Sequence, residues 1–521
     1  MPRESIAGAT PYDALFTGGA AVHPVTSSTI AEFFRCSMGL SAWKEYRSAR
    51  WALRVNPSSG NLHPTEAYLI QPTRVAHYAP REHALEERCL LRGAPWPVEG
   101  SDGGAFLVAI TSIHWREAWK YGERAFRYCQ HDAGHAIAAL RFAAALLGWR
   151  FVLLPQWTDA QLSAVLGLDR AGDFAGAELE EPECVGVVTP GEVAPWLAAD
   201  PERIVEAARA GRWAGRANAL SPTRVEWPII DEVANATRRV MGKGDWRVRV
   251  GGTDSAAEPT PQVSAPAPPI TMGPVPEKPA RQIILQRRSA VAFDARSSLP
   301  RRTFMSMLER TKPALSAVAQ DGAKAEAPWD AIDWPPQVHL LIFVHRVDGL
   351  TPGVYAYMRD PSVTAEWRTA MRSEFLWEPM NDSNDSNDPN DSNDSNDSNG
   401  LFLLLPFDVG WVANRVSCDQ DIAADGFFSL GMIARLESSL KERGDWFYRR
   451  LFWECGMLGQ VLYLEAEAAG ARATGIGCFY DNPVHEAAGL SGLEWQSLYH
   501  FSMGVPVEDD RLTTEPGYEW E

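Results

Sequence analysis

Four short stretches of this sequence could bind a ligand or move a proton, and the first lies at residues 56–66. It reads NPSSGNLHPTE and separates an ordered segment from the apolar residues 67–70. Proline, glycine, serine and asparagine at this density are typical of a turn rather than of the interior of a helix or strand. The alternative is a shelf for the edge of a flat polar ligand, with small donors and acceptors at Pro57, Ser58, Ser59 and Asn61.

A basic stretch opens the second half of the chain, where residues 286–294 read QRRSAVAFD. Arg287, Arg288 and the hydroxyl of Ser289 would offer many donors in a compact fork, which suits a phosphate dianion. The other interpretation is the solvated basic end of a helix that includes residues 283–285.

Two glycines lie near the C-terminus, in the stretch ATGIGCF at residues 473–479. Gly475 and Gly477 flank Ile476, so backbone N–H groups there could approach a planar or anionic ligand closely. A tight strand turn is the alternative. The sequence contains neither G-x-G-x-x-G nor G-x-x-x-x-G-K-[ST], and it also lacks the H-E-x-x-H and G-x-S-x-G motifs of zinc proteases and hydrolases.

The fourth stretch holds a lysine beside a tyrosine. Lys120 and Tyr121 would form a proton-transfer pair if burial lowered the pKa of the lysine toward neutrality. The alternative is a basic, exposed first turn of a helix. His131, Asp132 and His135 follow closely, but their spacing would make a poor metal site. We expect them to bond backbone groups or to cap the helix, and we expect no metal.

Composition and charge narrow the class of protein. The chain has 521 residues, 45% of them apolar, and a formal net charge of −18, which disfavours nucleic acids and anionic membrane surfaces as partners. The sequence contains no apolar run long enough for a transmembrane helix, and the first residues have no apolar signal-peptide core. Seven cysteines without a C-x-x-C pair favour reduced thiols. We expect a cytoplasmic protein.

Two low-complexity segments divide the chain. Residues 251–280 are rich in proline and read as an extended linker between a first domain at 1–250 and a second at 281–521. Residues 381–399 repeat Asn, Asp and Ser, and we interpret them as a disordered surface insertion. Nothing in this regular repeat supplies a folded metal cage.

The two halves resemble each other when the chain is shifted by 322 residues, with no gap needed over residues 123–168. Gly134 then meets Gly456, and Gly148 meets Gly470. Matching glycines at corresponding places indicate a duplicated domain. Residues 133–147 are apolar almost all round, which predicts a helix buried on most faces and ended by Gly148. Strand-like runs at 67–70, 105–111, 185–188 and 338–345 alternate irregularly with helices. The sequence therefore predicts an α+β fold that is present twice.

Together these stretches resemble the nitroreductase superfamily of FMN enzymes, and in particular its SagB/ThcOx-type dehydrogenase branch. The resemblance covers most of both halves. It rests on residues 53–70, 120–128, 286–294, 339–357 and 459–479.

The resemblance implies a role for each stretch, because in that superfamily FMN lies where two subunits interlock. Arg287, Arg288 and Ser289 would hold the ribityl phosphate. The shelf would come from the other subunit, with Pro57, Ser58, Ser59 and Asn61 at the edge of the flavin ring, and Gly475, Ile476 and Gly477 would run along the ring system. In the dehydrogenase branch a Lys-Tyr pair assists deprotonation of the substrate, and it corresponds to Lys120 and Tyr121.

Departures from the family pattern are also informative. The first half has no Arg-Arg-Ser before its shelf, and residues 153–155 read LLP where the second half has GIG. The second half has WDAIDWPPQ at 329–337 and no counterpart of NPSSGN. We therefore expect two tandem nitroreductase-like domains that form an intramolecular pseudo-dimer with a single FMN, and a degenerate second pocket. Such a chain would function as a monomer.

Two classes of function follow. The first is an FMN-dependent oxidoreductase, either a SagB/ThcOx-like dehydrogenase of a small-molecule or peptidic substrate, or an NAD(P)H-dependent nitro or quinone reductase. The second is a catalytically silent flavin-binding protein, since half of the ancestral sites would be lost. No element that would recognise a peptide is readable in the sequence.

Overall fold

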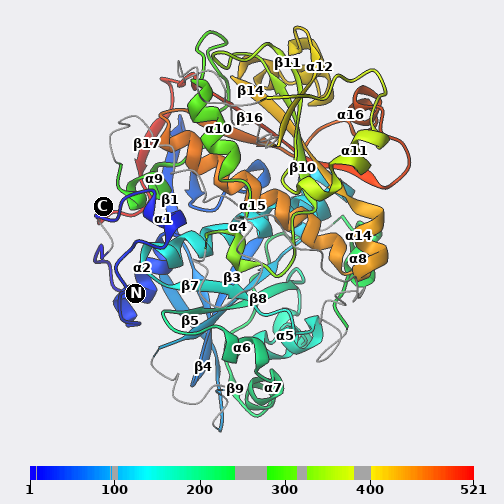
Figure 1. Ribbon diagram of the computed structural model, residues 1–521. Helices are drawn as coiled ribbons and strands as arrows, with labels where there is room; N and C mark the ends of the chain where they lie inside the picture. The colour runs from blue at the N-terminus through cyan, green and yellow to red at the C-terminus, as the bar shows by residue number, and fades with distance from the viewer. Residues whose placement is uncertain are drawn as a thin grey trace, which may run out of the picture.

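The chain folds into two lobes that meet along a pair of central helices (Figure 1). The computed structural model describes residues 1–6, 9–93, 96, 104–223, 225–240, 278–313, 326–380 and 400–521. The Asn-Asp-Ser repeat and most of the expected linker lie outside these residues. The end of that linker is described: Pro279 pairs with Pro11 in a short bridge, and Ala280 begins a helix.

The first lobe contains a seven-stranded sheet in the order β7-β8-β6-β3-β4-β5-β9, with antiparallel pairing. Its strands are β3 (Thr65–Gln71), β4 (Arg74–Ala79), β5 (Ala84–Leu90), β6 (Phe106–Ser112), β7 (Arg150–Leu153), β8 (Glu181–Thr189) and β9 (Arg212–Trp213). Its helices are α1 (Ala14–Thr17), α2 (Ser27–Arg35), α3 (Trp115–Tyr121), α4 (Ala125–Leu146), α5 (Asp159–Leu166), α6 (Ala194–Ala198), α7 (Glu202–Arg209) and α8 (Pro228–Ala236).

The second lobe repeats this arrangement in the order β15-β16-β14-β10-β11-β13-β12. Its strands are β10 (Val338–Val344), β11 (Gly353–Tyr357), β12 (Glu378–Pro379), β13 (Leu401–Pro406), β14 (Phe428–Arg435), β15 (Arg472–Ile476) and β16 (Trp495–Gly504). Its helices are α9 (Ala280–Gln286), α10 (Arg301–Glu309), α11 (Thr364–Ala370), α12 (Gly410–Val416), α13 (Ile422–Asp425), α14 (Leu436–Arg443), α15 (Phe447–Ala468) and α16 (Asp481–Ala488).

The predicted shift of 322 residues reappears in the element bounds. Helices α4 and α15 differ by 322 at both ends, and so do α5 and α16. The predicted strands and the α+β character are confirmed. The central helix begins at Ala125, eight residues before the predicted start, and Gly148 follows its end with a left-handed φ of 71°.

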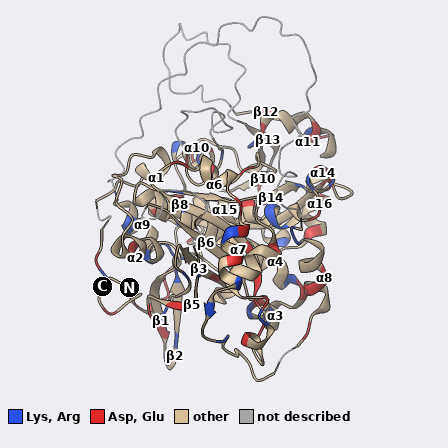
Figure 2. Cartoon of the chain, turned by 90° about the horizontal axis from the view of Figure 1, so that it is seen from below, with Lys and Arg blue, Asp and Glu red and all other residues tan. Residues whose placement is uncertain are grey.

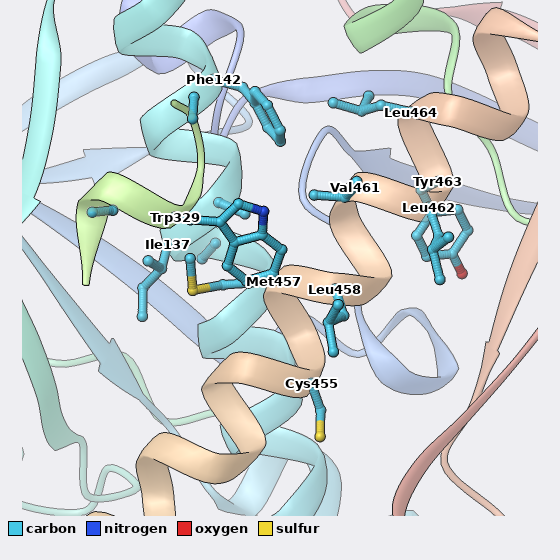
Figure 3. Close-up of a cluster of buried hydrophobic side chains, with 14 of the residues drawn as sticks. Ile137, Phe142, Trp329, Cys455, Met457, Leu458, Val461, Leu462, Tyr463 and Leu464 are labelled. Carbon is cyan, nitrogen blue, oxygen red and sulfur yellow. The ribbon is translucent and has the colours of Figure 1, made fainter. Parts of the chain in front are cut away.

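The paired helices α4 and α15 form the centre of the molecule. Nearly all of their residues are buried, in a hydrophobic core that takes side chains from both halves. Figure 3 shows one part of it, where Ile137 and Phe142 of α4 lie near Met457 and Val461 of α15, with Trp329 between the helices. Gly134 and Gly456 meet at the crossing. A methyl group on Gly456 would lie only 2.8 Å from the Cα atom of Gly134, so the two backbones touch there.

The second half also adds a strand to the first half. A three-stranded sheet has the order β17-β1-β2, in which the C-terminal strand β17 (Thr513–Pro516) pairs with β1 (Leu40–Tyr46), and β1 pairs with β2 (Ala49–Arg54). The last residue, Glu521, forms an ion pair with buried Arg35. The C-terminal segment thus wraps around the first half, and β2 leads directly into the predicted shelf.

The outer surface carries charges of both signs. Figure 2 shows acidic and basic residues interspersed over the outer helices and loops on the side that faces the viewer. Among the described residues, no helix combines the length and the apolar character needed to cross a membrane.

Candidate functional site

A cavity of about 460 Å³ lies between the two halves, a volume within the range of small-molecule and cofactor sites. The first half contributes β1, β2, the shelf and one face of α4, and the second half contributes the segment after α9, α15, β15 and β16. All of the predicted cofactor-binding residues line this one cavity: Pro57, Ser58, Ser59, Asn61, Arg287, Arg288, Ser289, Gly475, Ile476 and Gly477. Tyr121 also lines it.

Hydrogen bonds hold the shelf against the central helix α4. The backbone N–H of Ser59 donates to both carboxylate oxygens of Asp132, at 3.1 and 3.3 Å, and the Ser59 hydroxyl donates to Oδ1 at 3.2 Å. The Ser58 hydroxyl accepts a hydrogen bond from the His63 backbone at 2.7 Å. The Asn61 amide donates to the Ala52 carbonyl at 2.9 Å. These polar groups therefore hold the shelf in shape, and the predicted role of their side chains toward a ligand stays a prediction.

Gly60 makes the shelf possible. It forms a left-handed turn with Asn61, at φ values of 58° and 60°, a region that costs a glycine little and other residues more. A methyl group on Gly60 would overlap with the hydroxyl of Tyr121 and lie 3.1 Å from the Lys120 ammonium nitrogen. The predicted proton-transfer pair thus packs against the turn of the shelf.

Lys120 is exposed, so the burial that the proton-transfer hypothesis requires is not present in this structure. The lysine and Tyr121 end helix α3, and the alternative of a first helical turn is therefore wrong. The ammonium nitrogen lies 5.1 Å from the centre of the Tyr121 ring, and that ring meets Tyr128 of α4 edge-on at 4.7 Å.

The basic stretch follows the end of helix α9, as one interpretation expected. That end is not fully solvated, because Arg287 is only 3% exposed, although Arg288 is half-buried and Ser289 is exposed. The Arg287 guanidinium donates to the backbone carbonyls of Val55 and Arg54, at 3.3 and 3.2 Å. Its Nη1 atom has no hydrogen-bond partner among the described residues. Arg288 donates to the carbonyls of Leu285 and Ser41. Arginines of the second half thus bind backbone of the first half at the edge of the cavity.

Three cations that form no ion pair with a carboxylate among the described residues line this end of the cavity: Lys44, Arg287 and Arg288. Arg54 lines the cavity too, but its buried charge lies near that of Glu66. Burial lowers the pKa of Arg287, and burial together with the neighbouring Arg287 lowers that of Arg288 to about 9. Burial is the main cause of both pKa shifts, and the nearby carboxylate of Glu467 opposes them in part. A bound anion would compensate these buried charges further, in a chain whose net charge is −18.

Tyr463 of helix α15 links two of the predicted stretches. Its hydroxyl oxygen accepts from the N–H of Gly475 at 2.9 Å and lies 2.9 Å from the Ser289 hydroxyl. Gly475 belongs to strand β15, so the alternative of a turn is wrong there. A side chain on Gly475 would meet Tyr499, and one on Gly477 would meet Tyr128. Both glycines permit a close approach of the backbone to aromatic rings that line the cavity.

Two buried carboxyl groups lie beneath the shelf. Burial raises the pKa of Glu117, and nearby Asp132 adds to the shift. Burial also raises the pKa of Asp132, against the opposing hydrogen bonds from Ser58 and Ser59. Of the two acids, Asp132 lines the cavity, so a buried carboxyl group borders it as well as the cations.

This acid pair is expected to make the protein less stable as the pH rises. Above the ordinary glutamate pKa of 4.5, the unfolded chain releases protons that the native pair retains, so the free energy of unfolding should fall between about pH 5 and pH 8. Glu117→Gln should remove part of this pH dependence. The difference in free energy of unfolding between the variant and the wild type should rise, in favour of the variant, by at least about 1.4 kcal/mol from pH 5 to pH 8. Urea denaturation at both pH values measures the difference.

Glu123→Gln is the matched control, because Glu123 is exposed on the next turn. It should leave the pH profile of stability unchanged. Equal profiles for wild type and Glu117→Gln would contradict the expectation.

The three residues expected to cap the helix lie inside it instead. His131 donates from Nε2 to the Leu498 carbonyl at 3.0 Å, as expected for a backbone contact. His135 bonds side chains of the other half, Gln460 and Tyr499, each at 3.3 Å. The capping interpretation is wrong because the helix starts at Ala125. The two histidines instead contact the other half, and Asp132 contacts the shelf.

The place related to this cavity by the 322-residue shift is filled. Glu454 corresponds to Asp132, but it forms an ion pair with Arg359 and accepts hydrogen bonds from Trp334 and the Gln337 backbone. A space of only about 30 Å³ remains there, lined by apolar residues such as Leu153 and by charged ones such as Glu183 and Arg449. Tryptophans of the WDAIDWPPQ segment thus occupy the position where the first half has its shelf.

Several residues of the cavity escaped the sequence analysis. Lys44, Arg54, Tyr463 and Tyr499 belong to strands and a helix whose pattern is explained by the core alone. The sequence could have pointed to such residues only by their position beside a recognised motif. Arg54, for example, lies two residues before the stretch that forms the shelf.

The cavity thus lies between two intertwined α+β halves, with a basic end and a wall that contains two glycines. Residues 24–177 match the model of the nitroreductase family, a stretch that includes the shelf and helix α4. This part of the chain is therefore nitroreductase-like in sequence as well as in fold. No curated protein is significantly similar to the chain.

Solved structures extend the likeness to the whole fold. The crystal structure of a proposed nitroreductase from Anabaena variabilis is 18% identical, with a TM-score of 0.63 over 97% of this chain and 93% of that one. At this identity the likeness concerns the fold, which the two chains share along nearly their full lengths.

Two partial likenesses have TM-scores too low to support an argument. A proposed nitroreductase from Ralstonia eutropha is 15% identical and covers 49% of this chain and 97% of its own, with a TM-score of 0.29. A chain of the Escherichia coli microcin synthetase McbBCD complex, with truncated pro-MccB17 bound, is 18% identical over 37% of this chain and 71% of its own, with a TM-score of 0.25.

Proposed function

We propose that this protein is an FMN-dependent oxidoreductase with one flavin between its two halves. One observation carries the proposal. The shelf of the first half and the Arg-Arg-Ser stretch of the second, which are 230 residues apart in the chain, line the same cavity. The nitroreductase match of residues 24–177 supports the same class of enzyme.

The residues present fit FMN. Arg287 has an unpartnered buried nitrogen at the cavity, and its cluster with Lys44 and Arg288 suits the phosphate dianion of the ribityl chain. Ser289 would add a hydroxyl donor. Gly475 to Gly477 leave the backbone close to a flat ring system, and Pro57 to Asn61 would meet its edge. FMN, when bound, would supply the capacity to accept or donate a hydride.

Proton transfer would fall to Lys120 and Tyr121. The hydroxyl of Tyr121 lies against Gly60 at the shelf, and the lysine stands at the surface beside it. A substrate entering over the shelf would cover the lysine and supply the burial that a proton-transfer role requires. We therefore favour a SagB/ThcOx-like dehydrogenase that acts on a small-molecule or peptidic substrate.

We further propose that the chain is a tandem duplicate that functions as a monomeric pseudo-dimer. The filled second site, with Glu454 paired to Arg359, supports a single flavin. Purified protein reconstituted with FMN and freed of excess ligand should contain one flavin per chain. Absorbance of the released flavin against protein concentration measures this ratio. A ratio of two would contradict the single site, and a colourless protein that takes up no FMN would contradict the oxidoreductase.

An NAD(P)H-dependent nitro or quinone reductase is the alternative, and the nitroreductase match favours it. Anaerobic addition of NADH or NADPH separates the two functions. Bleaching of the yellow protein by a nicotinamide would favour the reductase. Yellow protein that no nicotinamide bleaches would favour the dehydrogenase or a catalytically silent flavoprotein.

A further inference from the structure

Two of the seven cysteines meet at the surface. The Sγ atoms of Cys418 and Cys478 lie 2.6 Å apart, although 60 residues separate them in the chain. Cys478 is exposed and Cys418 is half-buried, whereas the other five cysteines are buried. These two thiols are therefore the pair that a reagent in solution can reach.

Hydrogen bonds hold the two cysteine segments side by side. The Tyr480 backbone donates to the Val416 carbonyl at 3.0 Å, and the Tyr480 hydroxyl donates to Asp419 at 3.2 Å. The Gln420 amide donates to the Cys478 carbonyl at 3.2 Å. Bonds on both sides of the thiols thus fix their approach, so the contact does not depend on the cysteines alone.

The backbone at Cys418 is shaped for this contact. Cys418 and Asp419 both have left-handed conformations, with φ of 58° and 54°. Such values are uncommon outside glycine and persist where the surroundings enforce them. The turn follows helix α12 directly.

The pair lies at the mouth of the candidate site. Cys478 lines the cavity and follows Gly477 directly. Arg124 of the first half donates to the carbonyls on either side of it, to Gly477 at 3.1 Å and to Phe479 at 3.3 Å. The cysteine therefore lies on the glycine-containing wall, where both halves meet.

We propose that Cys418 and Cys478 form a reversible dithiol–disulfide site at the mouth of the cavity, with a low-molecular-weight disulfide as the co-reactant. The Cys478 thiolate attacks one sulfur of the small disulfide, a mixed disulfide forms, and one thiol leaves. The Cys418 thiol then loses its proton and attacks the Cys478 sulfur, which releases the second small thiol. Two protein thiols are oxidised and one disulfide is reduced to two thiols.

The surroundings assign the order of attack. Exposed Cys478 is the thiol that an incoming disulfide can reach. Burial and the hydrogen bond to Cys478 raise the pKa of Cys418 to about 12, which disfavours its thiolate and suits the resolving role. The bond would tie the end of the Gly475–Gly477 wall to the end of helix α12. The proposal concerns the thiols only and stands whether or not the cavity holds FMN.

The full-length chain, treated with glutathione disulfide and then unfolded in an alkylating reagent, tests the proposal by mass spectrometry. We expect the number of alkylated thiols to fall from seven to five, with a crosslinked peptide pair that contains Cys418 and Cys478. Dithiothreitol should restore all seven. In Cys418→Ser, glutathione should remain on Cys478 as a stable mixed disulfide.

Cys89→Ser is the control, because Cys89 is buried away from the cavity. It should leave the crosslink unchanged. Seven alkylated thiols after treatment of the wild type would overturn the proposal. A wild-type protein that keeps glutathione on Cys478 without the crosslink would overturn it too.

Discussion

Gly134→Ala is expected to lower the free energy of unfolding by about 2 kcal/mol. Inserting a methyl group into a packed core costs about 1–3 kcal/mol and occasionally more, since rigid neighbours must move. Here the methyl would overlap with the Trp453 carbonyl oxygen and lie 2.7 Å from its Cα, and backbone has no rotamer to change. Alanine gains about 1 kcal/mol in helix propensity over glycine, which offsets only part of the cost.

Gly456→Ala should have an effect of similar size, because its methyl would overlap with the His131 carbonyl oxygen on the other helix. Urea denaturation of each variant measures the loss. Gly172→Ala is the matched control, since nothing lies within 4 Å of a methyl group there, and its stability should stay within about 0.5 kcal/mol of wild type. Wild-type stability in Gly134→Ala would mean that the helices do not touch at this crossing.

Arg287→Ala is expected to weaken FMN binding by roughly 10- to 100-fold, measured by fluorescence titration of the apoprotein. A hydrogen bond to a charged group contributes about 1.5–3 kcal/mol, and each 1.4 kcal/mol corresponds to a factor of about ten in Kd. Arg287 is the arginine with an unpartnered buried nitrogen at the cavity. Because the variant removes one of three clustered cations, its affinity should also depend less on salt concentration.

Arg296→Ala is the control, since Arg296 is exposed nine residues further along the same segment. It should bind FMN as the wild type does. Thermal unfolding of the apo variants separates binding from folding, because Arg287 also donates to two backbone carbonyls of the first half. Unchanged affinity in a folded Arg287→Ala would exclude this arginine as a phosphate ligand.

Much of the fold was predictable because it depends on local pattern. Continuous apolar runs identified strands such as β10, and the 322-residue shift matched the two central helices to each other residue by residue. The start of α4 was not predictable. Residues 125–132 carry Arg127, Gln130, His131 and Asp132, which look like the polar end of a loop. They are helical because the other half and the shelf supply their partners, and no periodicity reports such contacts.

The motifs of the site were predictable from the sequence, but the contacts that their residues make were not. The small residues around Ser59 are visible in the sequence as an irregular stretch, yet their hydrogen bonds go to Asp132 of α4. Arg287 looked like a solvated helix end, and it is buried because strand β2 of the other half covers it. In both cases the partner lies more than 70 residues away.

Spacing and composition along the chain sufficed for the repeated α+β architecture, the paired helices and the stretches that can form a site, because each depends on neighbours close in sequence. Which stretches meet depended on long-range packing. The glycine crossing of α4 and α15 and the strand that β17 adds to β1 set one half against the other. That packing opened one cavity, filled its counterpart with tryptophan, and brought Cys418 to Cys478.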